Sequence, residues 1–177
     1  MSSKTNAGDD SVTKNAAKKH ANTFGEASQV AAYISDHGIG TTNVEQTTIA
    51  GRQVTVSSPL TENERDRVAE AIREVNPVEK GCFVNAFKVW AHDSSFHYVE
   101  GYASIDDNPD FGFEHAWNSI NGKLVDVTIH FDDYFGVVFA DNNLLSKYHQ
   151  FAEETDVWAI IGNHEDRFAF LHECGYY

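Results

Sequence analysis

The sequence is poor in cysteine, proline and methionine, and it contains no long hydrophobic run. Its 177 residues include two cysteines, Cys82 and Cys174. Two cysteines are too few for a disulfide framework in a domain of this size, so we expect a reducing compartment and at least one free thiol. A Cys82–Cys174 bridge with a redox role stays open as a weaker alternative.

No apolar run approaches the ~18 residues that span a bilayer, and the N-terminus lacks an apolar stretch of signal-peptide type. We therefore expect a cytoplasmic location and no membrane partner, with export by another route left open.

Positive charge is also scarce. The chain has 13 lysines and arginines against 27 acidic residues, for a net charge of −14. Four lysines against two aspartates give residues 1–24 a charge of +2, so the remaining body carries −16. Such a body repels phosphate backbones, and we predict no nucleic-acid partner.

Several chemistry-bearing motifs are missing. The sequence has no G-x-x-x-x-G-K-S/T run, no G-x-G-x-x-G run after a strand and no H-E-x-x-H, which removes the usual support for nucleotide-phosphate and zinc-protease chemistry. His164, His172 and Cys174 match no zinc-binding spacing, so we predict no metal and no cofactor.

The hydrophobic and aromatic content of the sequence suits one packed domain. Hydrophobic residues make up 41% of the chain and aromatics 12%, which is enough for a core. We interpret residues 1–24 as a polar tail, flexible or weakly helical, and residues 25–177 as a single domain. Periodicity predicts helices, then antiparallel strands, which is the α+β class. The predicted helices are 26–36, 61–76 (with a Thr61–Glu64 capping box), 81–91 and 143–153, with a last helical piece near the C-terminus after an apolar run at 158–161; the predicted strands are 53–57 (within a 39–59 loop), 96–105, 113–120, 123–129 and a fully buried 134–140.

Cys82 is the candidate nucleophile. It follows Gly81 at the predicted start of a helix, where the helix dipole and unpaired backbone N–H groups stabilise a thiolate. The glycine allows a tight turn and lets a substrate carbonyl approach. The Cys82 amide could then donate to an oxyanion.

His115 and Asp126 are the candidate base and its orienting carboxylate. Asn121-Gly122 is a strong two-residue hairpin signal that would pair Ile120 with Lys123. Counted from that pair, His115 and Asp126 are diagonal neighbours on one face of the hairpin, within reach of each other. Asp126 could then hold one ring nitrogen while the other faces Cys82, as in a catalytic triad.

The ordered set of motifs resembles the transglutaminase-like superfamily of papain-like folds. The resemblance rests on Cys82 at a helix start, then His115-Ala116-Trp117, then Gly122-Lys123-Leu124-Val125-Asp126-Val127-Thr128. Cys82-x-x-Asn85, the Tyr98–Tyr102 strand (YVEGY) and Glu114–Asn118 (EHAWN) are similar to a group of small bacterial and phage proteins. Val127 stands where many relatives have proline. The resemblance covers roughly residues 78–130.

This resemblance implies a papain-like core, with the helix that bears the cysteine packed on an antiparallel sheet that bears the histidine and aspartate. It implies hydrolysis of a peptide or side-chain amide, or transfer to an amine, on a protein or peptide substrate. Some relatives with this fold have lost catalysis, so a binding or inhibitor module is the alternative. All three matching positions are chemically intact here, which favours an enzyme.

Three further residues are candidates to support the site. Asn85, one helical turn after Cys82, would point its amide toward the oxyanion or fix the helix to the sheet. Glu100 would tune the site or bind an amine substrate, and a structural hydrogen bond is an equally good interpretation. Trp117 shares the face of His115 and would shield the pair from water, although packing alone explains it. Cys82 taken alone could also be an ordinary buried cysteine.

Overall fold

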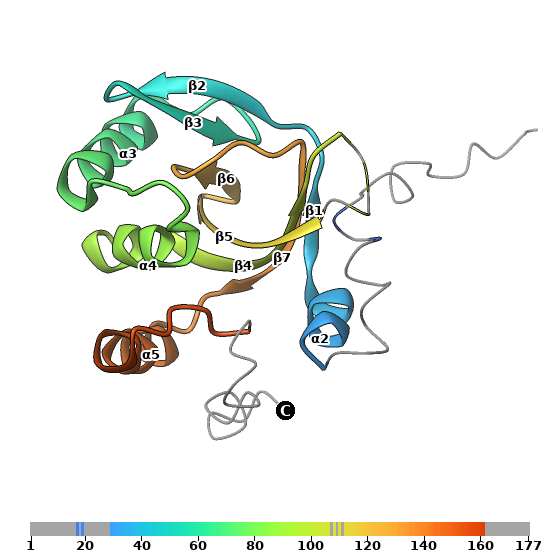
Figure 1. Ribbon diagram of the computed structural model, residues 1–177. Coiled ribbons are helices and arrows are strands. Elements are labelled where there is room, and N and C mark those ends of the chain that lie inside the picture. The colour runs from blue at the N-terminus through green and yellow to red at the C-terminus, as the bar shows by residue number, and fades with distance from the viewer. Residues whose placement is uncertain are drawn as a thin grey trace, which may run out of the picture.

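The protein is an α+β structure built on one seven-stranded antiparallel sheet (Figure 1). The computed structural model describes residues 29–106, 108, 110 and 112–161, together with positions 17 and 19. The sheet order is β1-β7-β4-β5-β6-β3-β2, and every neighbouring pair is antiparallel. The strands are β1 (Ile39–Thr41), β2 (Glu45–Ile49), β3 (Arg52–Val56), β4 (His97–Ser104), β5 (Gly112–Ile120), β6 (Lys123–Asp126) and β7 (Asp133–Phe139); the helices are α2 (Gln29–His37), α3 (Glu62–Val75), α4 (Cys82–His92) and α5 (Asn142–Thr155).

Most of the predicted elements are confirmed, with shifts of a few residues at their ends. Positions 17 and 19 are helical. The rest of the 1–24 tail and the last predicted helical piece lie outside the described residues. None of the described helices is long and apolar enough to cross a membrane.

The segment 39–59 is where the prediction was wrong. It holds three strands rather than a loop with one strand. The hairpin of β2 and β3 turns at Ala50 and Gly51, both with positive φ (49° and 77°). Alanine rarely adopts positive φ, so the dipeptide gave no hairpin signal.

Strand β6 is shorter than the predicted 123–129 and ends at Asp126. The reason is local. The Asp126 carboxylate accepts hydrogen bonds from the amides of Thr128 (2.8 Å) and Ile129 (3.4 Å), which turns the chain out of the sheet. Strand β7 also differs in one respect, because Val138 is exposed where full burial was predicted.

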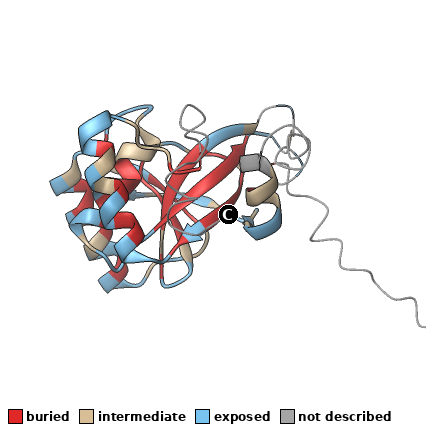
Figure 2. Ribbon diagram, turned by 90° about the horizontal axis from the view of Figure 1, so that it is seen from below, coloured by how far each residue is buried: buried red, intermediate tan, exposed pale blue. Residues whose placement is uncertain are grey.

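Helices α3, α4 and α5 lie along one side of the sheet, and α2 lies beside β7 (Figure 1). The central strands are mostly buried, and the helices beside them carry exposed residues on their outer faces (Figure 2). Side chains alternate between faces along a strand. Even-numbered residues of β5 therefore meet α4, where Asn118 donates to Ala86 O at 2.9 Å. Odd-numbered residues, His115 and Trp117 among them, face the other side.

A second, smaller cluster packs on that other face. Trp117 and Tyr134 anchor it, with their ring centroids 5.1 Å apart in an edge-on arrangement. Gly136 makes room for the indole, since a Cβ at this position would lie 2.6 Å from Trp117. The other buried members are Val99, Ala103, Leu124 and Phe131.

The capping box of α3 also fixes the β5–β6 hairpin. Thr61 accepts from the Glu64 amide, and the Glu64 carboxylate accepts from the Thr61 amide, as predicted. The same carboxylate accepts from the side chains of Asn121 (2.9 Å) and Lys123 (2.7 Å). These bonds lower the pKa of Glu64 to about 2, the Asn121 bond contributing most. Glu64 therefore anchors the hairpin that carries His115 and Asp126.

We expect Glu64→Gln to lower the free energy of unfolding by about 1–2 kcal/mol near neutral pH, because it weakens a helix cap and a charged pair. The folded pKa lies below the ordinary 4.5, so this stabilisation is complete above about pH 4.5 and is lost as the pH falls toward 2. Urea unfolding between pH 3 and 7 measures both effects. Glu62→Gln, on the exposed first turn of the same helix, is the control and should change stability far less.

Candidate active site

Cys82 is the first residue of α4 and a free, half-buried cysteine. Gly81 caps the helix without any side-chain hydrogen bond. The first amides of a helix lack partners within the helix, and the dipole there favours negative charge. The predicted placement of the thiol at a helix N-terminus is therefore confirmed. Cys174 lies outside the described residues, as do His164 and His172.

The hairpin that carries His115 and Asp126 has the predicted register. Ile120 pairs with Lys123, and Asn121 and Gly122 have φ values of 51° and 77°. Both values are positive, as the predicted type I′ turn requires. The diagonal relation brings the two side chains together, with His115 Nε2 2.6 Å from Asp126 Oδ2.

Asp126 is a buried carboxylate with four hydrogen-bond donors. Its side chain is 0% exposed. Oδ1 accepts from the Thr128 and Ile129 amides, at 2.8 and 3.4 Å. Oδ2 accepts from His115 Nε2 and from Tyr134 Oη, at 2.6 and 3.2 Å. Burying a charge is costly unless it is paired and hydrogen-bonded, and here both conditions are met.

The N-terminus of α4 reaches His115 where β6 has turned away. Strand β6 pairs with β5 only at residues 118–120, so His115 lies beyond that pairing. Thr128, just past the end of β6, accepts a hydrogen bond from Asn85 in the first part of α4. Cys82 lies near enough to His115 to contribute to raising its pKa. The structure therefore pairs His115 directly with Asp126 and places the Cys82 side chain near the same imidazole.

The electrostatics of His115 reflect both partners. Burial lowers its pKa, but the charge and hydrogen bond of Asp126, together with the hydrogen bond of Cys82, outweigh burial and raise the pKa to about 9. Asp126 holds the ring by Nε2. With a pKa of about 9, the imidazole of His115 carries its second proton at neutral pH.

Aromatic rings enclose the His–Asp pair. Trp117 stacks with His115 at a centroid separation of 6.0 Å, and Phe131 meets it edge-on at 4.8 Å. His115 is 2% exposed as a result. Trp117 therefore packs against the histidine, an arrangement that also keeps water from one face of the ring.

Asn85 ties the start of α4 to its surroundings. Its Nδ2 donates to Val78 O (2.8 Å) and to Thr128 Oγ1 (3.0 Å), while its Oδ1 accepts from the Val78 amide (3.0 Å). Both donors of the amide are engaged. Of the two roles expected from the sequence, this arrangement favours anchoring over oxyanion binding.

Glu100 lies on the helix-covered face of β4 and is 1% exposed. It accepts from Tyr98 Oη at 2.6 Å, from the Ile161 amide at 2.8 Å and from the Ile160 amide. These bonds match the structural interpretation of Glu100, since they hold the chain after α5 against the core.

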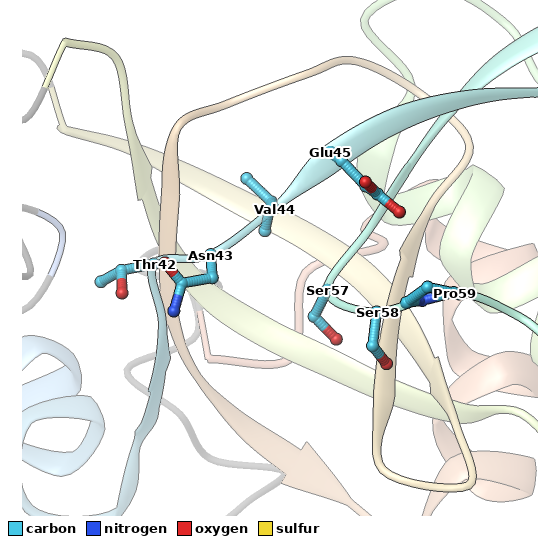
Figure 3. Close-up of a pocket in the computed structure, with 7 residues that line it drawn as sticks. All are labelled: Thr42, Asn43, Val44, Glu45, Ser57, Ser58 and Pro59. Carbon is cyan, nitrogen blue, oxygen red and sulfur yellow. The ribbon is translucent and has the colours of Figure 1, made fainter.

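The polar hollow in Figure 3 lies apart from these residues. It has a volume of about 390 Å³ and none of the predicted site residues lines it. Its walls carry hydroxyls, one amide and one carboxylate. The lining residues are Thr42, Asn43, Val44, Glu45, Ser57, Ser58 and Pro59.

Sequence reasoning missed Tyr134. Its hydroxyl donates to Asp126 Oδ2 and accepts from the Phe131 amide at 3.1 Å. Burial, followed by the charge of Asp126, raises the pKa of Tyr134 well above its ordinary range, so the hydroxyl keeps its proton. The tyrosine lies eight residues from Asp126 in an apolar strand, and no local spacing connects the two.

Comparisons with known proteins do not extend this description. No protein-family model, curated protein or solved structure matches the chain.

We expect His115 to titrate with a pKa of about 9, and Asp126→Asn to bring it below the ordinary 6.5, because burial then acts without the opposing carboxylate. Since the folded pKa is raised, the stabilisation from this pair is complete below about pH 6.5 and is lost as the pH rises through about 9. NMR titration of the imidazole measures the pKa. Asp132→Asn, which removes the carboxylate 3.7 Å from His130, is the control and should leave the pKa of His115 unchanged.

Tyr134→Phe should raise the pKa of His115 further, because Asp126 Oδ2 loses a competing donor and its charge acts more fully on the imidazolium. It should also lower the free energy of unfolding by about 1–3 kcal/mol, since a buried carboxylate loses a partner. The matched control is Tyr148→Phe, which removes a hydroxyl that donates to Ala159 O. That variant should lose stability without moving the pKa of His115. Equal pKa values in both variants would contradict a positioning role for Tyr134.

Proposed function

We propose that this protein is a thiol-dependent acyl-transfer enzyme with a papain-like, transglutaminase-like core. Its substrate is a peptide or a side-chain amide of a protein. The observation that carries the proposal is the buried 2.6 Å contact between His115 and Asp126, with Cys82 at a helix N-terminus against the same imidazole. A nucleophile, a base and a group that orients the base are the parts that covalent catalysis at a carbonyl requires.

In the first half-reaction, Cys82 Sγ attacks the carbonyl carbon and its proton passes to His115 Nδ1. Asp126 holds the ring by Nε2 and stabilises the imidazolium. The carbonyl oxygen gains negative charge, which the Cys82 amide at the start of α4 can stabilise. His115 then gives the proton to the leaving nitrogen as the carbon–nitrogen bond breaks. The product is a thioester on Cys82.

The second half-reaction reverses these roles with a new nucleophile. His115 takes a proton from water or from an amine as that group attacks the thioester carbon. The carbon–sulfur bond then breaks and the proton returns to the thiolate. Water makes the enzyme a peptidase or deamidase, and an amine makes it a transglutaminase-like ligase. Both outcomes use the same three residues.

The test is the reactivity of Cys82. At pH 6–7, we expect iodoacetamide to label Cys82 rapidly and selectively, because a neighbouring imidazole can accept the thiol proton as the sulfur attacks. Mass spectrometry of the digested protein gives the rate at each cysteine, with Cys174 as the internal reference. His115→Ala should slow the labelling of Cys82 by about tenfold or more.

His97→Ala is the matched control, since His97 lies exposed on the adjacent strand β4, and it should leave the rate unchanged. The alternative, a binding module on the same fold, predicts that Cys82 and Cys174 label at similar, slow rates. That result, obtained with a folded protein, would end the case for an enzyme.

A further inference from the structure

Two apolar side chains beside the triad are more than half exposed. Val78 is 54% exposed and Ile129 is 53% exposed. Val78 lies four residues before Cys82, and Ile129 lies three residues after Asp126. Single exposed apolar residues are common on protein surfaces, so exposure alone says little. This pair differs because hydrogen bonds hold its two chain segments together and because both residues lie close to the proposed triad.

Two polar side chains fasten the segments that carry the pair. Arg52 donates from Nη1 to Pro77 O at 2.9 Å and from Nε to Val127 O. Asn85 bonds to the backbone of Val78 and to the hydroxyl of Thr128. Each of these side chains therefore joins the segment just before α4 to the segment just after β6. Val78 and Ile129 consequently lie on neighbouring, fixed stretches of chain.

Both residues also lie close to residues of the proposed triad: Val78 contacts the residue before Cys82, and Ile129 bonds to Asp126. The Val78 side chain lies over Gly81, the residue before the nucleophile, since a Cβ on Gly81 would be 2.6 Å from Val78 Cγ2. The Ile129 amide donates to Asp126 Oδ1 at 3.4 Å. Val78 therefore packs against the residue that precedes Cys82, and the backbone of Ile129 bonds to the carboxylate that holds His115.

We propose that Val78 and Ile129 form the binding surface for an aliphatic side chain of the acyl donor, adjacent to the carbonyl that Cys82 attacks. The inference rests on the proposed function and specifies its substrate class: an uncharged or basic peptide with an aliphatic residue next to the reacting amide. The net charge of −14 disfavours an acidic peptide. Arg52 and Asn85 order the surface before the substrate arrives, which lowers the cost of binding.

The experiment compares two alkylating probes on the full chain, iodoacetamide and N-hexyliodoacetamide. Both carry the same reacting group, and only the second has an aliphatic chain. We expect the second-order rate at Cys82 to be about tenfold higher for the hexyl probe, since burying about two methylene groups is worth roughly that factor. The ratio of the two rates on free cysteine corrects for intrinsic reactivity.

The variants Val78→Ser and Ile129→Ser should each reduce this ratio about threefold or more. Ile39→Ser is the matched control, because Ile39 is also more than half exposed but lies on β1. It should leave the ratio unchanged. Circular dichroism confirms that each variant is folded.

The hexyl-to-iodoacetamide rate ratio and the absolute iodoacetamide rate distinguish a failure of the aliphatic surface from a failure of the proposed enzyme. A slow iodoacetamide rate equal to that of Cys174 contradicts the proposed enzyme, whereas a parent ratio near one contradicts the aliphatic surface alone. A high ratio that survives both substitutions places the hexyl site elsewhere and overturns the assignment. A dimer that dissociates on Ile129→Ser with no change in ratio identifies the surface as a contact between copies of the chain, which also overturns it.

Discussion

The structure of the site depends on keeping one carboxylate charged inside the protein. Asp126 has no exposed side-chain surface, and it receives two backbone amides on one oxygen and the imidazole and a tyrosine hydroxyl on the other. Without these donors the charge could not remain buried. The two amides also end β6, and the chain just past that end is tied to α4 through the hydrogen bond from Asn85 to Thr128.

The surroundings of the pair explain how an imidazole can keep a high pKa although it is almost fully buried. Burial favours the neutral ring, and the adjacent carboxylate opposes burial and prevails. Aromatic rings exclude water from the pair, which strengthens this electrostatic interaction. Cys82, the proposed nucleophile, is in contrast only half-buried. The proposed acyl transfer requires such a protected base together with a nucleophile that a substrate can reach.

Interactions at the edge of the site give it rigidity. Glu64 fastens the turn of the hairpin to α3, Asn85 fastens α4 to the end of β6, and Glu100 holds the chain after α5 to the core. For Asn85 and Glu100 the sequence left a role in the chemistry and a structural role open. Their polar atoms are engaged with backbone and side chains of the fold, which favours the structural role and positions the elements that carry Cys82, His115 and Asp126.

Short-range signals in the sequence were enough to predict the local secondary structure of this protein. Three local features each depend on residues within a few positions of one another: the Thr61–Glu64 cap, the helix that begins at Cys82 and the Asn121-Gly122 turn. The turn also determines the register that brings His115 close to Asp126. Only the tertiary structure decided that Cys82 lies near that pair and that Tyr134 bonds to Asp126. It also decided that Arg52 and Asn85 join the chain before α4 to the chain after β6. These contacts join segments far apart in the chain, and their formation depends on the packing of the sheet and helices as a whole, which no local pattern encodes.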